Sequence, residues 1–520
     1  MEKGKINKRT TKKNIICLEL EKNDGKIVTI SERYIRNHEV WKTLADGVYD
    51  VEYELMNGKP VKIKIGSTLI DLTQTQQPNK NPNYHQAHSN PDNENSVDTA
   101  TAPYNFIPLN DVIFTTEPKC IPPFNQYKNN NGYIDLDITA LSPIYIRKTL
   151  TEEEEKKLVE LENSNNLAEL ADFKLSLSGF YKPADAEFRI PGSSLRGMIR
   201  TLYEVVTYSK MTFIDENEKL MYRGVKEKKL YQHSIGELRP EKHKSKELDM
   251  AEAVFGYIKD NDILPGRVYF EDAICDTPDK ILKEQNPKIL SSPKPTSFQY
   301  YIQQYPKIGN LEKNKINRLK NYDSPNACLA GFKFYWHRDS NDWTANPDDV
   351  RKNKTQYTKI QPLDKNSHFK GRIRFTNLSD TELGALLFIL NLPEGCAHKI
   401  GMAKPLGLGS IRIDAKLNLI DRQKRYTNLK DEGIKEIEDF SPYLQAYYQL
   451  LNDNLNIQIN DPWTDIERLK QLKCMLDFDH KPSSEKTRYL EIEHLTPNGV
   501  KENEYKLRRI LQKPCQLVNS

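Results

Sequence analysis

Two arginines at the start of one predicted helix are the first residues whose types and spacing suggest chemistry. Residues 190–200 read Ile-Pro-Gly-Ser-Ser-Leu-Arg-Gly-Met-Ile-Arg, in which either serine can cap a helix and the arginines share one face. Free N–H groups and guanidinium groups together suit a phosphate group. An ordinary capped helix with solvated arginines is the alternative interpretation. The candidate binding residues are Gly192, Ser193, Ser194, Arg196 and Arg200.

A glycine-rich segment further along the chain is the second candidate. Residues 398–413 read His-Lys-Ile-Gly-Met-Ala-Lys-Pro-Leu-Gly-Leu-Gly-Ser-Ile-Arg-Ile, so glycines allow close backbone approach and lysines supply charge. The spacing matches neither the phosphate loop of NTPases nor the dinucleotide fingerprint. A structural turn is one alternative, and a phosphate- or nucleotide-binding enzyme that uses this loop is another. The candidate residues are Lys399, Gly401, Lys404, Gly407 and Gly409.

Together these two segments resemble the RAMP superfamily of CRISPR-associated proteins, whose members pair such a helix start with a C-terminal Gly-rich loop. Residues 253–256 (Ala-Val-Phe-Gly) and 266–273 (Gly-Arg-Val-Tyr-Phe-Glu-Asp-Ala) resemble the middle signature of the family. Residues 102–106, 292–296 and 334–337 are similar to a large subfamily of type III systems, of subtype III-D. The resemblance implies a subunit of an RNA-guided effector complex. Its partners would be crRNA, which it grips along the backbone, target RNA and other type III effector subunits.

The resemblance also implies a candidate nuclease centre. Type III backbone subunits often cut target RNA with a loop aspartate and a divalent metal, a short distance before the helix-start motif. Asp185 matches that position and is the candidate catalytic residue and metal ligand, and Asp172 is a second catalytic candidate. A carboxylate can hold Mg²⁺ or another divalent metal, or orient the attacking 2′-hydroxyl. The alternative is a non-catalytic RNA-binding scaffold without a cofactor, in which these are solvated carboxylates.

Composition limits the other classes of function. The 77 basic and 73 acidic residues give a net charge of +4, so any RNA contact must come from local basic surface. Seven scattered cysteines without a Cys-x-x-Cys pair argue against a zinc ribbon and predict free thiols in a reducing compartment. The N-terminus has no apolar signal core, and no stretch approaches the ~20 apolar residues of a membrane span. We therefore expect a cytoplasmic protein without membrane contact.

The N-terminal part predicts a small β domain followed by a linker. Short β-like runs and an Asn57-Gly58 hairpin signal place a β-barrel-like domain at residues 1–70, with a faint resemblance to OB or cold-shock folds. Binding of single-stranded RNA is one role for it, and a structural or docking role is the alternative. Residues 71–103 are rich in Asn, Gln and Pro and predict a disordered linker.

Periodicity and capping signals predict an α+β core at residues 104–416. The expected order is strand, helix, strand, strand, helix, strand, which is the ferredoxin-like (RRM-like) order that the RAMP resemblance also implies. Ser379 and Glu382 form a capping box for the second helix. The expected elements are 133–138, 194–207, 267–275, 369–375, the helix from Ser379, and 409–414.

Three insertions and a C-terminal region complete the expected organisation. The insertions lie at about 150–172, which predicts a charged helix, at 215–249, which predicts an exposed arm, and at 276–367. Residues 417–520 predict amphipathic helices at 443–451, 463–475 and 504–512, for subunit docking or for closing the core. A stripe that mixes basic and aromatic residues resembles an RNA-stacking surface, although core packing is the alternative. The stripe consists of Lys294, Tyr300, Tyr301, Lys333, Tyr335, Trp336 and His337.

Overall fold

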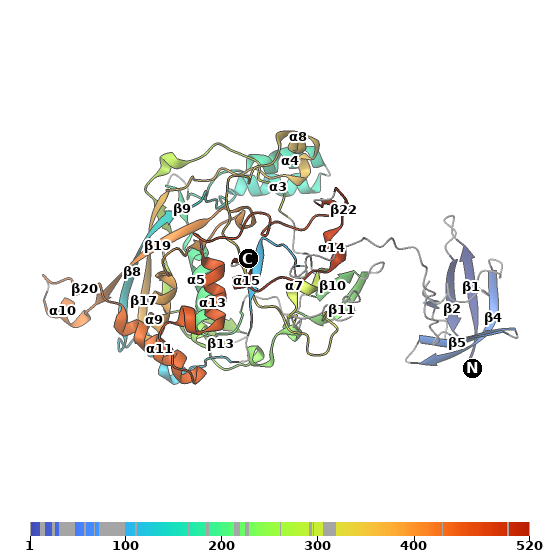
Figure 1. The fold of residues 1–520 in the computed structure, drawn as a ribbon, viewed down its shortest axis with the longest axis horizontal. Helices are drawn as coiled ribbons and strands as arrows, with labels where there is room; N and C mark the ends of the chain where they lie inside the picture. The colour runs from blue at the N-terminus through green and yellow to red at the C-terminus, as the bar shows by residue number, and fades with distance from the viewer. Residues whose placement is uncertain are drawn as a thin grey trace, which may run out of the picture. The chain divides into compact units, whose positions relative to one another are not determined.

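The computed structural model divides the 520-residue chain into two units, Met1–Ser96 and Val97–Ser520 (Figure 1). Asp185, the Asn57-Gly58 turn and most of the predicted linker lie outside the described residues. The structure describes residues 2–10, 16–22, 27–30, 47–56, 59–66, 68–71, 99–109, 112–164, 166–183, 187–212, 219–223, 228–259, 262–290, 294, 296–304, 319–428, 430–496 and 499–518.

The first unit is a six-stranded antiparallel sheet in the order β3-β2-β1-β4-β5-β6. Alternating side chains point to a small core, in which Ile6, Leu20, Tyr53 and Ile63 are fully buried. Among the described strands of this unit, β3 and β6 are not paired with each other. Its strands are β1 (Glu2–Thr10), β2 (Ile16–Lys22), β3 (Ile27–Ile30), β4 (Gly47–Met56), β5 (Lys59–Ile65) and β6 (Thr68–Asp71).

The second unit is built on an eight-stranded sheet, in which one long strand lies on each side of β8. The order is β18-β19-β8-β17-β15-β9, while β14 also pairs with β17 and β20 with β19. All of these pairs are antiparallel, and the mixed α+β class is confirmed. The strands are β8 (Asn130–Ala140), β9 (Arg189–Ile190), β14 (Val268–Phe270), β15 (Ala273–Cys275), β17 (His368–Leu378), β18 (His398–Lys399), β19 (Ser410–Ile420) and β20 (Ile434–Ile437).

Helices α5 (Gly192–Val206) and α9 (Asp380–Leu390) pack beside this sheet, with α11 (Ser441–Leu455) against α9 (Figure 1). The predicted capping box at the start of α9 is present, with Ser379 accepting from the N–H of Glu382. The helix is buried on all sides because both the sheet and α11 cover it. A Cβ on Gly384 would lie 2.0 Å from the carbonyl oxygen of Tyr443, so glycine permits this close helix contact.

Two predicted elements are interrupted in the structure. The strand expected at 267–275 splits into β14 and β15 around Glu271 and Asp272, and both pieces pair with β17. The charged helix expected at 150–172 is instead two helices, α3 (Glu152–Asn163) and α4 (Leu167–Ser176). Local capping explains the second break, because Ser164 ends α3 and the Asn166 side chain caps α4.

The ends of the predicted linker and arm are packed rather than exposed. Ala100 and Ala102 are buried, although the linker was expected to extend to residue 103. In the 215–249 insertion, His243 and Asp249 are buried, so the expectation of an exposed arm fails there. The reason is that the Asp249 carboxylate caps α6 (Met250–Phe255) from inside the core. The other elements of this insertion are β10 (Lys219–Arg223), β11 (Lys228–Ser234), η2 (Gly236–Leu238) and η3 (Glu241–Lys244).

The C-terminal region is helical only in part. The predicted helix 443–451 lies within α11, but the one at 463–475 breaks at Ile466, whose backbone is extended. The helix expected from Glu504 ends after Leu507, because Arg508 adopts a left-handed conformation. The elements are α10 (Arg422–Thr427), α12 (Pro462–Asp465), α13 (Glu467–Leu476), α14 (Glu504–Leu507), α15 (Pro514–Val518), β21 (His494–Leu495) and β22 (Lys501–Glu502).

A disulfide joins Cys474 of α13 to Cys515 of α15. This corrects the expectation that all cysteines are free thiols, and the error arose because the pair is 41 residues apart and has no local signal. Cys120, Cys275 and Cys396 are thiols. In the part of the chain that the structure describes, no helix is both long and apolar enough to cross a lipid bilayer.

The insertion at 276–367 contributes packed structure to the second unit. Leu363 is fully buried and bridges to Ile144, just after β8. Strand β16 (Phe332–Tyr335) pairs with β7 (Tyr104–Ile107), so two segments far apart in the sequence lie side by side. The remaining elements are β12 (Tyr257–Lys259), β13 (Asp262–Leu264), α7 (Phe298–Tyr301), α8 (Pro347–Lys352), η1 (Pro118–Cys120), η4 (Pro278–Lys280) and η6 (Lys354–Gln356).

The ion pair between Arg267 and Glu382 is expected to be essential for the second unit. The Arg267 side chain is 2% exposed, pairs with both Glu382 oxygens and also donates to the carbonyls of Ala253 and Asn377. Glu382→Ala leaves this guanidinium buried without its counterion, which should cost about 3–5 kcal/mol of unfolding free energy. Urea unfolding followed by tryptophan fluorescence measures it. The exposed Glu436→Ala is the matched control, and equal effects of the two variants would contradict the prediction.

Candidate functional site

The N-terminus of α5 is already occupied by a carboxylate. The helix begins at Gly192 after Pro191, and neither Ser193 nor Ser194 caps it, contrary to the expected role of a serine. Instead the Gly192 N–H donates to Asp272 Oδ1 at 2.8 Å. The break between β14 and β15 places Asp272 at this position. Its negative charge complements the helix dipole, so a phosphate there would compete with it.

The two arginines of α5 share one face, as predicted, and both guanidinium carbons lie 5.8 Å from the Phe255 ring centre. Arg196 is half-buried and donates to the Phe255 carbonyl at 2.7 Å, and burial lowers its pKa, with a further contribution from the charge of Arg200. Arg200 is buried, pairs with Glu204 at 3.0 Å and donates to the Gly256 carbonyl. A phosphate can therefore reach Arg196 more readily than Arg200.

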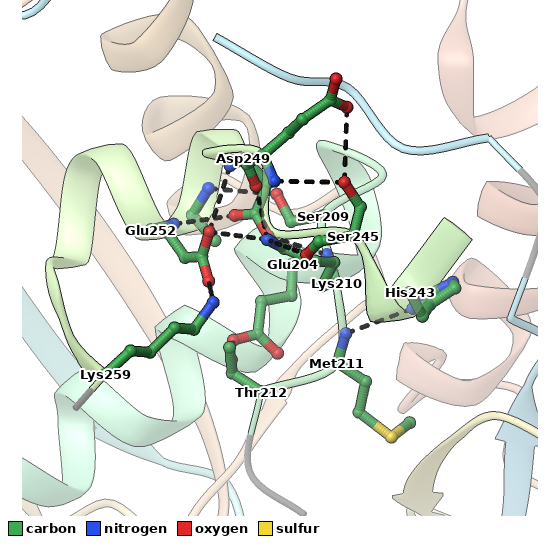
Figure 2. A network of polar contacts seen from close by, with 12 residues as sticks. Glu204, Ser209, Lys210, Met211, Thr212, His243, Ser245, Asp249, Glu252 and Lys259 are labelled. Carbon is green, nitrogen blue, oxygen red and sulfur yellow. Dashed lines mark hydrogen bonds and ion pairs between the residues drawn. The ribbon is translucent and has the colours of Figure 1, made fainter. Parts of the chain in front are cut away.

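A buried polar network adjoins Arg200 through its partner Glu204, and Figure 2 shows this network. Lys210 is 3% exposed and pairs with Glu252 at 2.8 Å, and Lys259 reaches the other oxygen of Glu252. Burial raises the pKa of Glu204 to about 7, and burial followed by the charge of Glu252 raises the pKa of Asp249. These contacts connect the end of α5 to the start of α6. They thereby position the carbonyl groups that the two arginines bind.

The glycine-rich loop between β18 and β19 packs tightly against the core. Gly401 has φ +85°, and a Cβ there would lie 2.5 Å from the carbonyl oxygen of Tyr145. Gly409 has φ +78°, and its Cβ would lie 1.8 Å from the carbonyl oxygen of Ile400. Gly407 is also left-handed and ends the short η7 (Lys404–Leu406). The glycines are therefore required by the turn itself, whether or not a ligand binds.

The lysines of this loop form a cationic cluster. Lys399 donates to the Ser410 hydroxyl at 3.3 Å, and no carboxylate pairs with Lys399 or Lys404 among the described residues. Burial lowers the pKa of Lys399 to about 7, helped by the charges of Lys404, Arg338 and Lys481. Burial also lowers the pKa of Lys404. Because desolvated cations without counterions are costly, the cluster suits an anionic ligand.

Sequence reasoning missed Arg338 and Lys481 as part of this cluster. The Arg338 guanidinium donates to the carbonyls of Pro405 and Thr487, while its buried Nε has no partner among the described residues. Lys481 pairs with Asp339 at 3.5 Å. Arg338 directly follows the basic and aromatic stripe, in which Trp336 and His337 prove to be core residues at 1% exposure. The position of Arg338 directly after this stripe was the one signal in the sequence for its place in the cluster.

The two candidate segments lie at opposite edges of the main sheet. β9, which leads into α5, is at one edge, and β18, which leads into the glycine-rich loop, is at the other. Five spacings of about 4.8 Å separate these strands, which gives a separation of about 24 Å. The fold therefore does not gather both sets of residues around one phosphate. A ligand that contacts both must be an extended chain.

Of the two candidate nuclease residues, the structure describes only Asp172. Asp185 lies outside the described residues, and the nearby Glu187 is exposed and pairs with Arg189. Asp172 lies on the exposed side of α4 and pairs with Lys354 at 3.0 Å. The described residues contain no group of three or more His, Cys, Asp or Glu arranged to hold a metal. The described residues alone therefore contain no assembled metal site, and the role of Asp185 stays a prediction.

Comparison with known proteins identifies the family. No curated protein sequence matches the chain. One similar solved structure is a chain of a Type IV-B CRISPR complex, with 14% identity over 54% of this chain and 90% of that one. Its TM-score of 0.24 is too low to support an inference about fold or function. The family model of the RAMP superfamily matches residues 137–412, which is more than half of the chain and includes the candidate binding residues of both motif segments. The chain belongs to the RAMP superfamily.

Proposed function

We propose that this protein is a subunit of a type III CRISPR effector complex, of subtype III-D. It binds the backbone of crRNA and helps to position target RNA, together with other effector subunits. The observation that carries the proposal is the cationic cluster at the glycine-rich loop, within the region that matches the family. The strand order β19-β8-β17-β15, with α5 and α9 on the sheet, supports a ferredoxin-like core.

Binding of an RNA backbone fits the physical chemistry of the loop. A phosphodiester supplies the negative charge that Lys399 and Lys404 lack, and its recognition does not depend on base sequence. Arg196 offers a second contact near the opposite sheet edge, which an extended nucleic acid can reach and a single small phosphate cannot. This geometry favours a chain of phosphates over the nucleotide-binding enzyme, the rival interpretation.

Lys404→Ala should weaken retention of crRNA without affecting the fold. Loss of one phosphate contact should reduce the slope of log affinity against log salt concentration by about 0.7–1. The measurement is filter binding of the co-purified RNA, after sequencing has identified it, at several salt concentrations. Lys424→Ala removes one exposed positive charge from α10 and is the matched control.

Recovery of CRISPR-derived RNA with the wild type is the first expected result. If only mononucleotides bind, and Arg196→Ala or Lys404→Ala weakens their binding, the enzyme interpretation replaces the proposal. If Lys404→Ala and the control Lys424→Ala behave alike, the loop is not the RNA contact.

Lys399→Met should stabilise the fold while weakening RNA binding. The buried amine has a pKa of about 7 in the folded protein and an ordinary value of 10.5 when unfolded. The unfolded chain therefore binds more protons above pH 7, and wild-type stability should rise between pH 7 and pH 9. The variant should lack this rise with pH, and its free energy of unfolding at pH 7 should exceed that of the wild type by on the order of 1 kcal/mol. Chemical denaturation at both pH values checks this, and a loss of stability in the variant would contradict it.

Cleavage of target RNA is a separate part of the proposal. Asp185→Ala is expected to leave crRNA retention unchanged, because retention depends on cationic contacts to phosphates and a carboxylate supplies none. The measurement is cleavage of a complementary RNA in Mg²⁺ by the wild type and the variant. Loss of cutting at one mapped phosphate would make this subunit the nuclease. Unchanged cutting would assign catalysis to another residue or subunit and leave a binding scaffold.

A further inference from the structure

A small cavity in the second unit lies away from the glycine-rich loop and α5. Its walls come from the chain before and within β7, from α7, from β16 and from the C-terminal segment around α14. Its volume is about 50 Å³, compared with the ~15 Å³ that one water molecule needs. Six tyrosines and two lysines dominate the lining, and no carboxylate is among the described residues that line it. The tyrosines and lysines are Tyr104, Tyr300, Tyr301, Tyr335, Tyr489, Tyr505, Lys294 and Lys333.

Lys333 is the main charged group in this cavity. Its amine lies 3.8 Å from the ring centre of Tyr104 and 5.3 Å from that of Tyr335, so aromatic faces partly compensate its charge. No carboxylate pairs with it among the described residues. Burial lowers the pKa of Lys333 to about 8, so the amine is still mostly protonated at neutral pH.

Two buried hydroxyl groups in the lining of this cavity have no hydrogen-bond partner among the described residues. They are the Tyr300 hydroxyl, on a residue that is 5% exposed, and the Thr101 hydroxyl. The neighbouring hydroxyls are satisfied, since those of Tyr104 and Tyr301 lie 3.4 Å apart and the Tyr505 hydroxyl accepts from Lys294. Burying a hydroxyl without a hydrogen bond costs folding free energy, so these two hydroxyls suit a ligand that supplies an acceptor.

We propose that this cavity binds the phosphoryl group of a small ligand, either inorganic phosphate or a terminal phosphate of a nucleotide or RNA. The donors come from three separate segments of the chain, because Lys333 lies on β16, Tyr300 on α7 and Thr101 before β7. A tetrahedral oxyanion can accept hydrogen bonds from several sides at once, whereas a planar carboxylate presents its two oxygens in one plane. The cavity has room for the phosphoryl group, so any attached nucleoside lies outside it.

The site is independent of the proposed crRNA contact at the glycine-rich loop. Lys404 and Lys399 do not line the cavity, and Lys333 does not join their cluster. Loss of crRNA binding in a Lys404 variant would therefore leave phosphate binding unchanged, and the two proposals can fail separately.

Calorimetric titration of the full chain with inorganic phosphate tests the site. Lys333→Met is expected to weaken phosphate binding by about tenfold or more, and Tyr300→Phe by a smaller factor. Tyr300→Phe removes a hydroxyl that has no protein partner, so it should fold normally if Lys333→Met does not. The exposed Lys424→Met has the same change of charge and should bind like the wild type.

The pH dependence of phosphate binding provides a second readout. Raising the pH to about 9.5 should deprotonate Lys333 and weaken binding in the wild type but not in Lys333→Met. The titratable groups that face Lys333 are Lys294 and the tyrosines, and burial raises the pKa values of Tyr104, Tyr335 and Tyr489. Failure of the wild type to bind phosphate, or equal binding by wild type, Lys333→Met and Tyr300→Phe, would overturn the proposal.

Competition identifies the source of the phosphoryl group. Adenosine 5′-monophosphate and an RNA oligonucleotide with a 5′-phosphate are compared with the same oligonucleotide carrying a 5′-hydroxyl. Displacement of phosphate by the phosphorylated RNA alone supports an RNA end, and displacement by the mononucleotide supports a nucleotide. If neither displaces phosphate, the ligand is inorganic phosphate. Displacement by the 5′-hydroxyl RNA would show that the cavity does not select a terminal phosphate, which would overturn the proposal.

Discussion

The pairing of β8 with both β17 and β19 is the constraint on which the second unit depends. Ile134, Leu136, Ile138 and Ala140 of β8 all point into the core, so a shift of one residue would expose this whole set. Because the register is fixed, helices α5 and α9 pack against one sheet (Figure 1). The same register places the α5 start and the glycine-rich loop at opposite edges. The layout of the proposed binding surface is thus a consequence of sheet packing.

Buried positive charges in this fold are of two kinds. Arg267 and Lys210 are paired with carboxylates and hold elements together, as buried ion pairs do when their geometry is complete. Lys399 and Lys333 have no carboxylate partner among the described residues, and burial lowers the pKa of each. The charges that are paired with carboxylates stabilise the fold. Burial of a lysine without a carboxylate partner costs folding free energy, and a bound anion offsets that cost. Each of the two proposed sites therefore contains one of these lysines.

The helix-start motif proves to be structural as well as a candidate contact. Asp272 occupies the N-terminus of α5, and Arg200 is engaged with Glu204 inside the protein. Of the two arginines, Arg196 retains partial exposure beside the Phe255 carbonyl. A motif can therefore be characteristic of a family because it builds the local fold, while most of the ligand contacts come from elsewhere. In this protein the electrostatic argument for phosphate binding is stronger at the glycine-rich loop than at the start of α5.

The sequence alone determined the features that depend on neighbours along the chain. Capping of α9 by Ser379 and Glu382, the shared face of the two arginines on α5 and the order of the main strands along the chain were predicted, because caps and periodicity are local signals. Tertiary structure decided which distant groups meet. Asp272 reaches Gly192 across 80 residues, and Arg338 joins the lysines of a loop more than 60 residues away. Such pairings depend on sheet register and insertion packing, for which a single sequence contains no local signal.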